Sequence, residues 1–238
     1  GGVFDIAAAS STTLRMNNMV LAERFPIGIN GQIAFDTTQA MAGKLNDLTL
    51  SVARIPIVFN GNFSYHPDSI TTHNLCGRVK GMKITELLKY LPPNILKDKE
   101  AINSNATINI DVDVNGTYNF NTGALPSVKA SLEIPESHVE FKGRESRINR
   151  LAADIRARYS PGEKDTAIVE IRKMVIDGRG IHLGAKGRID DFTSDNPYID
   201  LGMTASAYLD TLCKLFPATT GSLFEGTVSA NLDVKSRL

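Results

Sequence analysis

The 238-residue sequence has no tryptophan and only 2 cysteines, too few for a disulfide-dense scaffold or a four-cysteine zinc site. It has no surplus of either charge, because 26 Lys and Arg residues balance 26 Asp and Glu residues. A nucleic-acid-binding protein usually carries a basic surplus, so we expect no nucleic-acid partner. No apolar run approaches the ~18 residues of a membrane-spanning helix.

The sequence begins with Gly1-Gly2 and has neither an initiator methionine nor a signal peptide. That start predicts an excised or processed piece, so any targeting signal or anchor would lie outside it. Apolar residues make up 42% of the chain and charged residues 22%, which argues against disorder. Frequent Val, Ile, Thr and Ser, punctuated by Gly and Asn, favour a mostly β protein.

Apolar and polar residues alternate most strictly from Ala106 to Val114, where every even position is apolar. This period of two predicts a strand with one buried and one wet face. The same alternation recurs in four further segments: 55–65, 181–189, 199–205 and 228–234. We predict roughly ten to twelve strands in antiparallel sheets. Asn115-Gly116 predicts a type I′ hairpin turn, and 121–123 predicts another turn.

Two segments, 83–91 and 208–216, have apolar residues at helical spacing, and a proline follows each. They lie about 125 residues apart and belong to a predicted internal repeat. Residues 147–159 fit either a helix or a strand, and the repeat alignment favours a strand. We therefore predict a mainly β fold with minor α: an extended, curved antiparallel sheet of two related repeats, 1–126 and 127–238, each with one short helix packed on the sheet.

Motifs for metals and cofactors are absent or incomplete. The sequence Asp111-x-Asp113-x-Asn115-Gly116 matches the first half of a calcium-binding loop, but Thr122 stands where the bidentate glutamate belongs. A wet strand face is the favoured interpretation. None of the histidines, His66, His73, His138 and His182, has zinc-binding spacing. We predict no metal and no cofactor. The sequence leaves open whether Cys76 and Cys213 are bridged.

Catalytic motifs are also missing, and we predict that the chain is not an enzyme and has no catalytic residues. No Gly-x-Ser-x-Gly elbow is present. A carbohydrate-active enzyme would need converging carboxylates such as Asp190, Asp191 and Glu225, and their spacing does not support this. The basic residues between Lys142 and Arg158 could bind anionic head groups, but a solvated strand face is the favoured interpretation.

The candidate ligand-binding residues are the apolar members of two alternating strands. An apolar sheet face can hold acyl chains, because each buried CH₂ contributes about 0.8 kcal/mol. The alternative is that these faces are ordinary core beneath helices. The lipid-facing candidates are Ile55, Ile57, Phe59, Phe63, Ile108, Ile110, Val112 and Val114.

The repeat unit resembles the AsmA-like proteins of Gram-negative envelopes. The resemblance rests on the strand with Gly61 or Gly187, the helical segment 83–91 with its proline, and the closing stretch 224–234. It implies repeating β-groove units in the periplasm, an N-terminal helix in the inner membrane outside this segment, and a role in outer-membrane assembly and lipid transport. It carries no catalytic residues over.

The resulting prediction is a non-enzymatic periplasmic segment of an inner-membrane-anchored envelope protein. Its apolar β-groove would shelter acyl chains of phospholipid or another envelope lipid, and envelope proteins would be its partners. The alternative is a structural or adhesive β-sandwich-type module that binds protein partners. The sequence does not determine the lipid, the oligomeric state, the strand order or the direction of transport.

Overall fold

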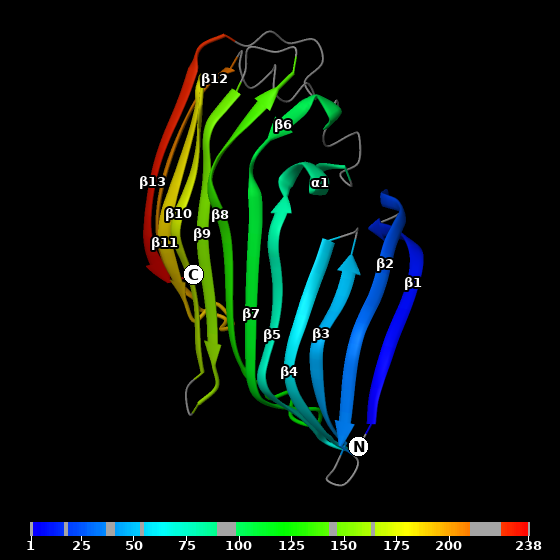
Figure 1. The fold of residues 1–238 in the computed structure, drawn as a ribbon. Coiled ribbons are helices and arrows are strands. Elements are labelled where there is room, and N and C mark those ends of the chain that lie inside the picture. Colours follow the sequence, from blue (N-terminus) through cyan, green and yellow to red (C-terminus); the bar gives the residue numbers. More distant parts are fainter. Residues whose placement is uncertain are drawn as a thin grey trace. The chain divides into compact units, whose positions relative to one another are not determined.

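The computed structural model describes residues 2–16, 19–36, 41–52, 55–89, 99–142, 147–162, 165–209 and 225–237 (Figure 1). The fold is mainly β, with 81% strand. Helix is scarce: α1 covers Ile84–Leu88, and a 3₁₀ turn, η1, covers Lys99–Ala101. The strands are β1 Gly2–Met16, β2 Met19–Asp36, β3 Ala42–Val52, β4 Ile55–His66, β5 Ser69–Lys83, β6 Ile102–Ser104, β7 Thr107–Asn119, β8 Ser127–Phe141, β9 Arg147–Ser160, β10 Thr166–Gly178, β11 Ile181–Asp190, β12 Tyr198–Tyr208 and β13 Thr227–Arg237.

The described strands form one open antiparallel sheet of 13 strands. Their order is β1-β2-β3-β4-β5-β7-β8-β9-β10-β11-β12-β13, and β6 pairs with β8 outside this path. The mainly β, antiparallel prediction is confirmed. A β-sandwich needs two sheets packed face to face, whereas these strands make a single sheet. The two repeats, the curvature and the helices packed on the sheet stay predictions.

Residue contacts divide the chain into two units. Unit 1 comprises residues 1–80, 110–131 and 157–167, and unit 2 comprises residues 81–109, 132–156 and 168–238. Each unit draws residues from both sides of position 126. The predicted boundary between residues 126 and 127 therefore stays a prediction.

Unit 1 has one apolar face, which the strand register defines. Leu50 pairs with Ile57, and Leu48 with Phe59, so these side chains share a face. Arg78 bonds to Asp111 on the opposite face, which puts the even residues of β7 on the apolar side. We call this surface the apolar face of unit 1; its members include Phe4, Ile29, Ile33, Phe35, Leu45, Leu48, Leu50, Ile55, Ile57, Phe59, Phe63, Ile70, Val79, Ile110, Val112 and Val114.

Unit 2 repeats the division between an apolar and a charged face. Register pairs Gly187 with Leu201 and Leu201 with Val234, on the face that also carries Ile189 and Ile199. The other face carries charged cross-strand neighbours: Glu170, Arg188, Asp200 and Lys235. Alternation with period two, as in the sequence, thus separates water-facing charge from apolar side chains.

Little of the apolar surface is buried. The chain exposes 15153 Å², whereas a compact protein of this mass exposes about 10,500 Å². Within the described ranges, no large side chain is fully buried, and the buried hydrophobic residues include small ones such as Ala106, Ala152 and Ala167. A sheet with nothing packed across its apolar face would leave its large side chains half-exposed in this way.

The predicted elements that are not regular strands had mixed outcomes. Within 83–91, α1 covers only Ile84–Leu88 and has no buried residue. One hydrogen bond connects its start to the chain next to β7: the Ile84 N–H donates to the Ala106 carbonyl (3.0 Å). Tyr90 and Leu91 lie outside the described residues, as does most of the second predicted helix, 208–216. The ambiguous segment 147–159 is strand β9, as the repeat alignment predicted.

The predicted hairpin at Asn115-Gly116 is wrong, because β7 continues through both residues to Asn119. The Asn115 side-chain oxygen instead accepts the Asn74 N–H (2.7 Å), so the pair accommodates an irregularity in the neighbouring strand. The predicted turn at 121–123 is confirmed. There the Asn119 side chain accepts the N–H groups of Asn121 and Thr122, both at 2.9 Å.

Candidate functional site

Seven of the eight predicted lipid-facing residues lie in unit 1, on its apolar face. Strand β4 supplies Ile55, Ile57, Phe59 and Phe63, and β7 supplies Ile110, Val112 and Val114. All seven are half-buried. The eighth, Ile108, is half-buried in unit 2. Strand β5 lies between β4 and β7 and contributes Ile70 and Val79 to the same face.

Two glycines let neighbouring backbones approach closely in the middle of this face. A Cβ on Gly61 would lie 2.5 Å from the Cα of Leu75, and one on Gly31 would lie 2.6 Å from the Cα of Leu48. Both glycines have positive φ, +141° and +147°. Each sits opposite a β-bulge, an extra residue that sharpens the local twist of a strand. Only glycine satisfies both the spacing and the φ at these two positions.

Asparagine and aspartate side chains hold the bulges on the opposite face. Asp47 and Asn74, the bulged residues, have φ of 48° and 52°. The Asp47 N–H donates to the Asn60 side-chain oxygen, and the Asn60 amide donates back to the Asp47 carboxylate, both at 2.9 Å. Asn and Asp tolerate this left-handed conformation better than other side chains. Sequence analysis missed the bulges, although the spacing of Gly31 and Gly61 was a signal.

Sequence analysis named Phe63 but missed the aromatic group around it, which lies on the apolar face, toward one end of the strands. Ring centroids are 5.7 Å apart for Phe4 and Phe35, and 6.1 Å for Phe35 and Phe63, both edge-to-face. Nearby, Phe120 contacts Tyr65 at 6.2 Å and Tyr118 at 5.5 Å. Phe4 is 57% exposed and Phe120 45% exposed. Apart from Phe63, these rings extend the apolar surface beyond the lipid-facing residues that were predicted.

The calcium-loop-like carboxylates are ion-paired instead of converging on a metal. Arg78 Nε lies 3.0 Å from Asp111, and its Nη2 lies 4.0 Å from Asp113. Both aspartates stand on the wet face of β7, as the favoured interpretation predicted. The four histidines are exposed. Among the described residues, no group of three or more His, Cys, Asp or Glu side chains could hold a metal ion.

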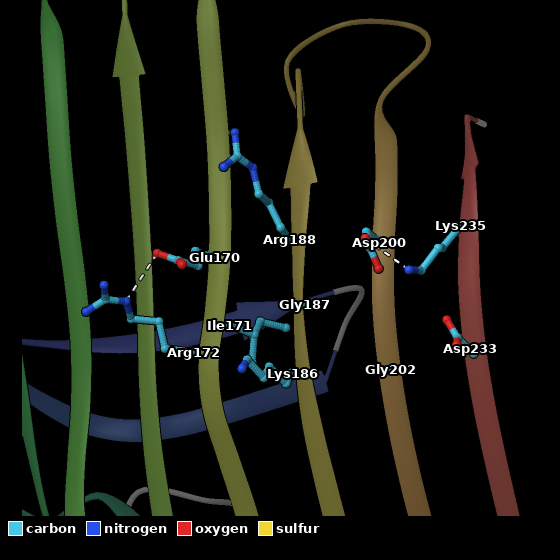
Figure 2. Close-up of a pocket in the computed structure, with 10 residues that line it drawn as sticks. All are labelled: Glu170, Ile171, Arg172, Lys186, Gly187, Arg188, Asp200, Gly202, Asp233 and Lys235. Carbon is cyan, nitrogen blue, oxygen red and sulfur yellow. Dashed lines mark hydrogen bonds and ion pairs between the residues drawn. The ribbon is translucent and has the colours of Figure 1, made fainter.

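Unit 2 has an open depression of about 630 Å³ on its charged face (Figure 2). Its floor includes Gly202, whose missing side chain leaves room between the neighbouring strands. Four cations and three carboxylates line it: Arg172, Lys186, Arg188, Lys235, Glu170, Asp200 and Asp233. Ion pairs join Arg172 to Glu170 (3.2 Å) and Lys235 to Asp200 (3.7 Å). Such exposed ion pairs contribute little to stability, and the charges around the depression nearly cancel.

The basic residues of 142–158 that the structure describes are largely exposed, and two of them are ion-paired. Arg150 lies 3.0 Å from Glu136, which also contacts Lys173 at 3.3 Å, and Arg156 lies 3.2 Å from Asp154. The Lys173 hydrogen bond, then Arg150, lowers the pKa of Glu136 below its ordinary value. Arg144 lies outside the described residues. This arrangement fits a solvated strand face better than a basic patch for head groups.

The carboxylates considered for a carbohydrate-active enzyme do not converge. Asp190 pairs with Tyr198 at the start of β12 and is bonded to Arg188 (2.6 Å), and Asp191 follows it in the turn. Glu225 precedes Thr227, which pairs with Tyr208 at the other end of β12. Ten residues of strand separate the two ends by about 33 Å. These three residues therefore make no common site.

Cys76 is a free, half-buried thiol on β5, and Cys213 lies outside the described residues.

In the described ranges, no helix has the length and apolar character needed to cross a membrane. Comparisons with protein-family models, curated proteins and solved structures found no match.

Proposed function

We propose that this chain is a non-enzymatic segment of an AsmA-like envelope protein, which shelters acyl chains of phospholipid or another envelope lipid on its apolar sheet face. The observation that carries the proposal is the apolar face of unit 1. Leu48 and Val79 are buried, but most of its other large side chains are half-exposed, and the described part of unit 1 contains strands and turns but no helix to cover them. A periplasmic location, with a membrane anchor outside this segment, belongs to the same proposal.

The dimensions of the face suit an acyl chain. Strand β4 has 12 residues, which span about 40 Å at ~3.4 Å per residue. One leaflet of a bilayer has a hydrocarbon thickness of about 15 Å, half of the ~30 Å core. An acyl chain of about 15 Å is therefore short enough to lie along the face from end to end of the acyl chain. Its CH₂ groups would then contact Ile, Leu, Val and Phe side chains.

The opposite face gives the sheet a water-facing side. In unit 1 it carries Arg78, Asp111 and Asp113 as ion pairs and the Asp47–Asn60 hydrogen bonds. Such groups cost free energy when they are removed from water, so this side stays solvated. Binding of lipid on the apolar side needs no reactive group, which is consistent with the absence of a converging catalytic set among the residues discussed above.

The first test is lipid capture by the chain itself. We expect native mass spectrometry of the chain, purified from a bacterial periplasm, to show bound phospholipid at a defined stoichiometry, identified after extraction. A fluorescent acyl-chain probe then measures affinity. We expect Ile57→Asp to weaken probe binding by about tenfold or more, because a carboxylate on the face would have to lose water against the acyl chain.

Val58→Asp is the matched control, because Val58 is also half-buried but points to the opposite face, where it pairs with Arg78. We expect it to bind the probe as the wild type does. Ile110→Asp repeats the test on β7, and circular dichroism confirms that each variant is folded. Equal binding by Ile57→Asp, Ile110→Asp and Val58→Asp would contradict the proposal and favour a protein-binding module.

A further inference from the structure

Exposed large apolar side chains gather at one end of the strands of unit 1. Met41, Tyr65, Phe120 and Leu125 are 56%, 40%, 45% and 46% exposed, and all four belong to unit 1. Met41 directly precedes β3, Tyr65 is the next-to-last residue of β4, and the other two lie in the connection between β7 and β8. We call these four residues and the half-buried Tyr118 the strand-end patch.

Backbone hydrogen bonds and ring contacts hold the strand-end patch together. The Tyr65 N–H donates to the Met41 carbonyl (3.1 Å), and the Phe120 N–H donates to the Asp68 carbonyl in the turn between β4 and β5 (2.8 Å). The Phe120 ring contacts the rings of Tyr65 and Tyr118. Strands β3, β4, β5 and β7 are all interior in the sheet order, so the exposure of this patch does not arise at a sheet edge.

The area of the strand-end patch suits a lipid surface better than a folded protein. Its four exposed side chains, at roughly 200 Å² each, present about 400 Å² to water. A stable protein interface buries about 800 Å² on each partner. Insertion of a few apolar side chains into the interfacial region of a bilayer has no such minimum, because its strength grows with each apolar group that is buried.

The residue types in the strand-end patch match those that lie at a membrane interface. Tyrosine is enriched there, because its ring enters the apolar region while its hydroxyl bonds to water and head groups. The adjoining turns contribute no Lys or Arg: 66–69 contains His66 and Asp68, and 119–126 contains no charged residue. A polybasic attraction to anionic lipid is therefore not the basis of binding here.

We propose that the strand-end patch docks this chain on the surface of a lipid bilayer. Its Phe, Leu and Met side chains insert among the acyl chains, and its two tyrosines lie at the level of the head groups. Tyr65 follows Phe63 on the same side of β4, so the patch is continuous with the apolar face of unit 1. Docking puts that end of the face at the bilayer surface, but it does not require the face to shelter a lipid.

Vesicle flotation tests the docking. We expect the full chain to float with vesicles of phosphatidylethanolamine and phosphatidylcholine, which carry no net charge. Added phosphatidylglycerol, or 1 M salt with its Debye length of ~3 Å, should change the partition coefficient by less than about twofold. Leu125→Asp should lower that coefficient about tenfold or more, because a carboxylate must lose water to enter the bilayer.

Tyr208→Asp is the matched control for flotation. Tyr208 is 52% exposed, but it lies in unit 2, outside the strand-end patch. We expect this variant to float as the wild type does. Loss of flotation in both variants to the same extent would mean that the patch is not the docking surface.

Tryptophan fluorescence tests insertion directly, because the chain has no tryptophan of its own. With vesicles present, the emission of Phe120→Trp should shift to shorter wavelength, and lipids with brominated acyl chains should quench it. Tyr208→Trp should show neither effect. Both variants replace one aromatic ring with another at an exposed position, so neither is expected to disturb the fold.

Acyl-chain capture separates this inference from the proposed function. Leu125→Asp should bind the fluorescent acyl-chain probe as the wild type does, because Leu125 lies outside the strands of the apolar face. If the wild type floats but does not bind the probe, the proposed function fails and the docking inference stands. A chain that does not float, that floats only with phosphatidylglycerol, or that responds alike as Phe120→Trp and Tyr208→Trp would overturn the docking inference and favour a protein as the occupant of the patch.

Discussion

Gly61 is the residue on which the middle of the apolar face depends most directly. It sits opposite bulges in both neighbouring strands, β3 and β5. A methyl group there would meet the Leu75 Cα at 2.5 Å, at a φ of +141° that side chains rarely adopt. We expect Gly61→Ala to lower the free energy of unfolding by about 2 kcal/mol or more, measured by urea denaturation.

Gly28→Ala is the control at the same scale. A Cβ on Gly28 would meet the Ala8 carbonyl oxygen at 3.6 Å and the Ser51 Cβ at 3.8 Å, which are ordinary contacts, and the residue has no positive φ. We expect a change within about 1 kcal/mol, because alanine also restricts the unfolded chain. Equal destabilisation by the two variants would show that the Gly61 position is not strained.

At the scale of the element, the strands were predictable because each alternating run contains its own evidence. Residues 106–114 and 55–65 became β7 and β4 with the expected sides apolar. The bulges were not predictable in this way, because a bulge is defined by the strand beside it. Asn115-Gly116 illustrates the limit. Alone the pair favours a turn, but in the structure the Asn74 backbone N–H donates to the Asn115 side-chain oxygen, and β7 continues through both residues.

The residues of the candidate site were likewise predictable only where a local pattern identified them. Its apolar residues on β4 and β7 were named from alternation alone, and the structure puts seven of the eight on one face of unit 1. The aromatic group brings together Phe4, Phe35 and Phe63 from strands β1, β2 and β4. No local pattern links these residues, because their contact follows from strand order and register, which the sequence left undetermined.

The ion pairs that link β8, β9 and β10 predict a pH dependence. Glu136 accepts hydrogen bonds from Lys173 and Arg150, which lower its pKa below the ordinary 4.5. Because the folded pKa is lowered, the pairs stabilise the fold above the unfolded pKa, and this contribution is lost as pH falls through the folded pKa. We expect Glu136→Gln to lower the urea midpoint slightly near neutral pH.

This difference between Glu136→Gln and the wild type should vanish once the pH falls below the folded pKa of Glu136. The effect is small because the Glu136 side chain is 59% exposed. Glu133→Gln, at an exposed residue of the same strand outside this cluster, is the control. A difference that grows as the pH falls would contradict the assignment of the ion pairs.

At the scale of the whole molecule, the chain buries an unusually small share of its surface. An unfolded chain of 25.8 kDa exposes about 37,000 Å², so 15153 Å² in the folded state means that about 60% is buried. A compact protein of this length buries roughly 70–75%. The missing contacts are those that a second layer would make with an apolar face.

The last prediction follows from this exposed apolar surface. We expect the native chain, without denaturant, to enhance the fluorescence of the dye ANS, and a phospholipid that binds the apolar face to displace the dye. At a free lipid concentration of 100 times the dissociation constant, that lipid should raise the free energy of unfolding by about 2.7 kcal/mol. For a chain of this length, the stabilisation corresponds to a rise in Tm of roughly 5–10 °C.

The urea dependence of the dye signal separates native binding from binding to a partly unfolded population. If the folded sheet itself binds ANS, the fluorescence should fall through the same transition in which circular dichroism loses its β signal. If the dye binds a partly unfolded state, the fluorescence should instead pass through a maximum within the transition. If the native chain did not bind ANS, the apolar face would have to be covered, because exposed side chains such as Phe4 and Phe120 would otherwise bind the dye and enhance its fluorescence.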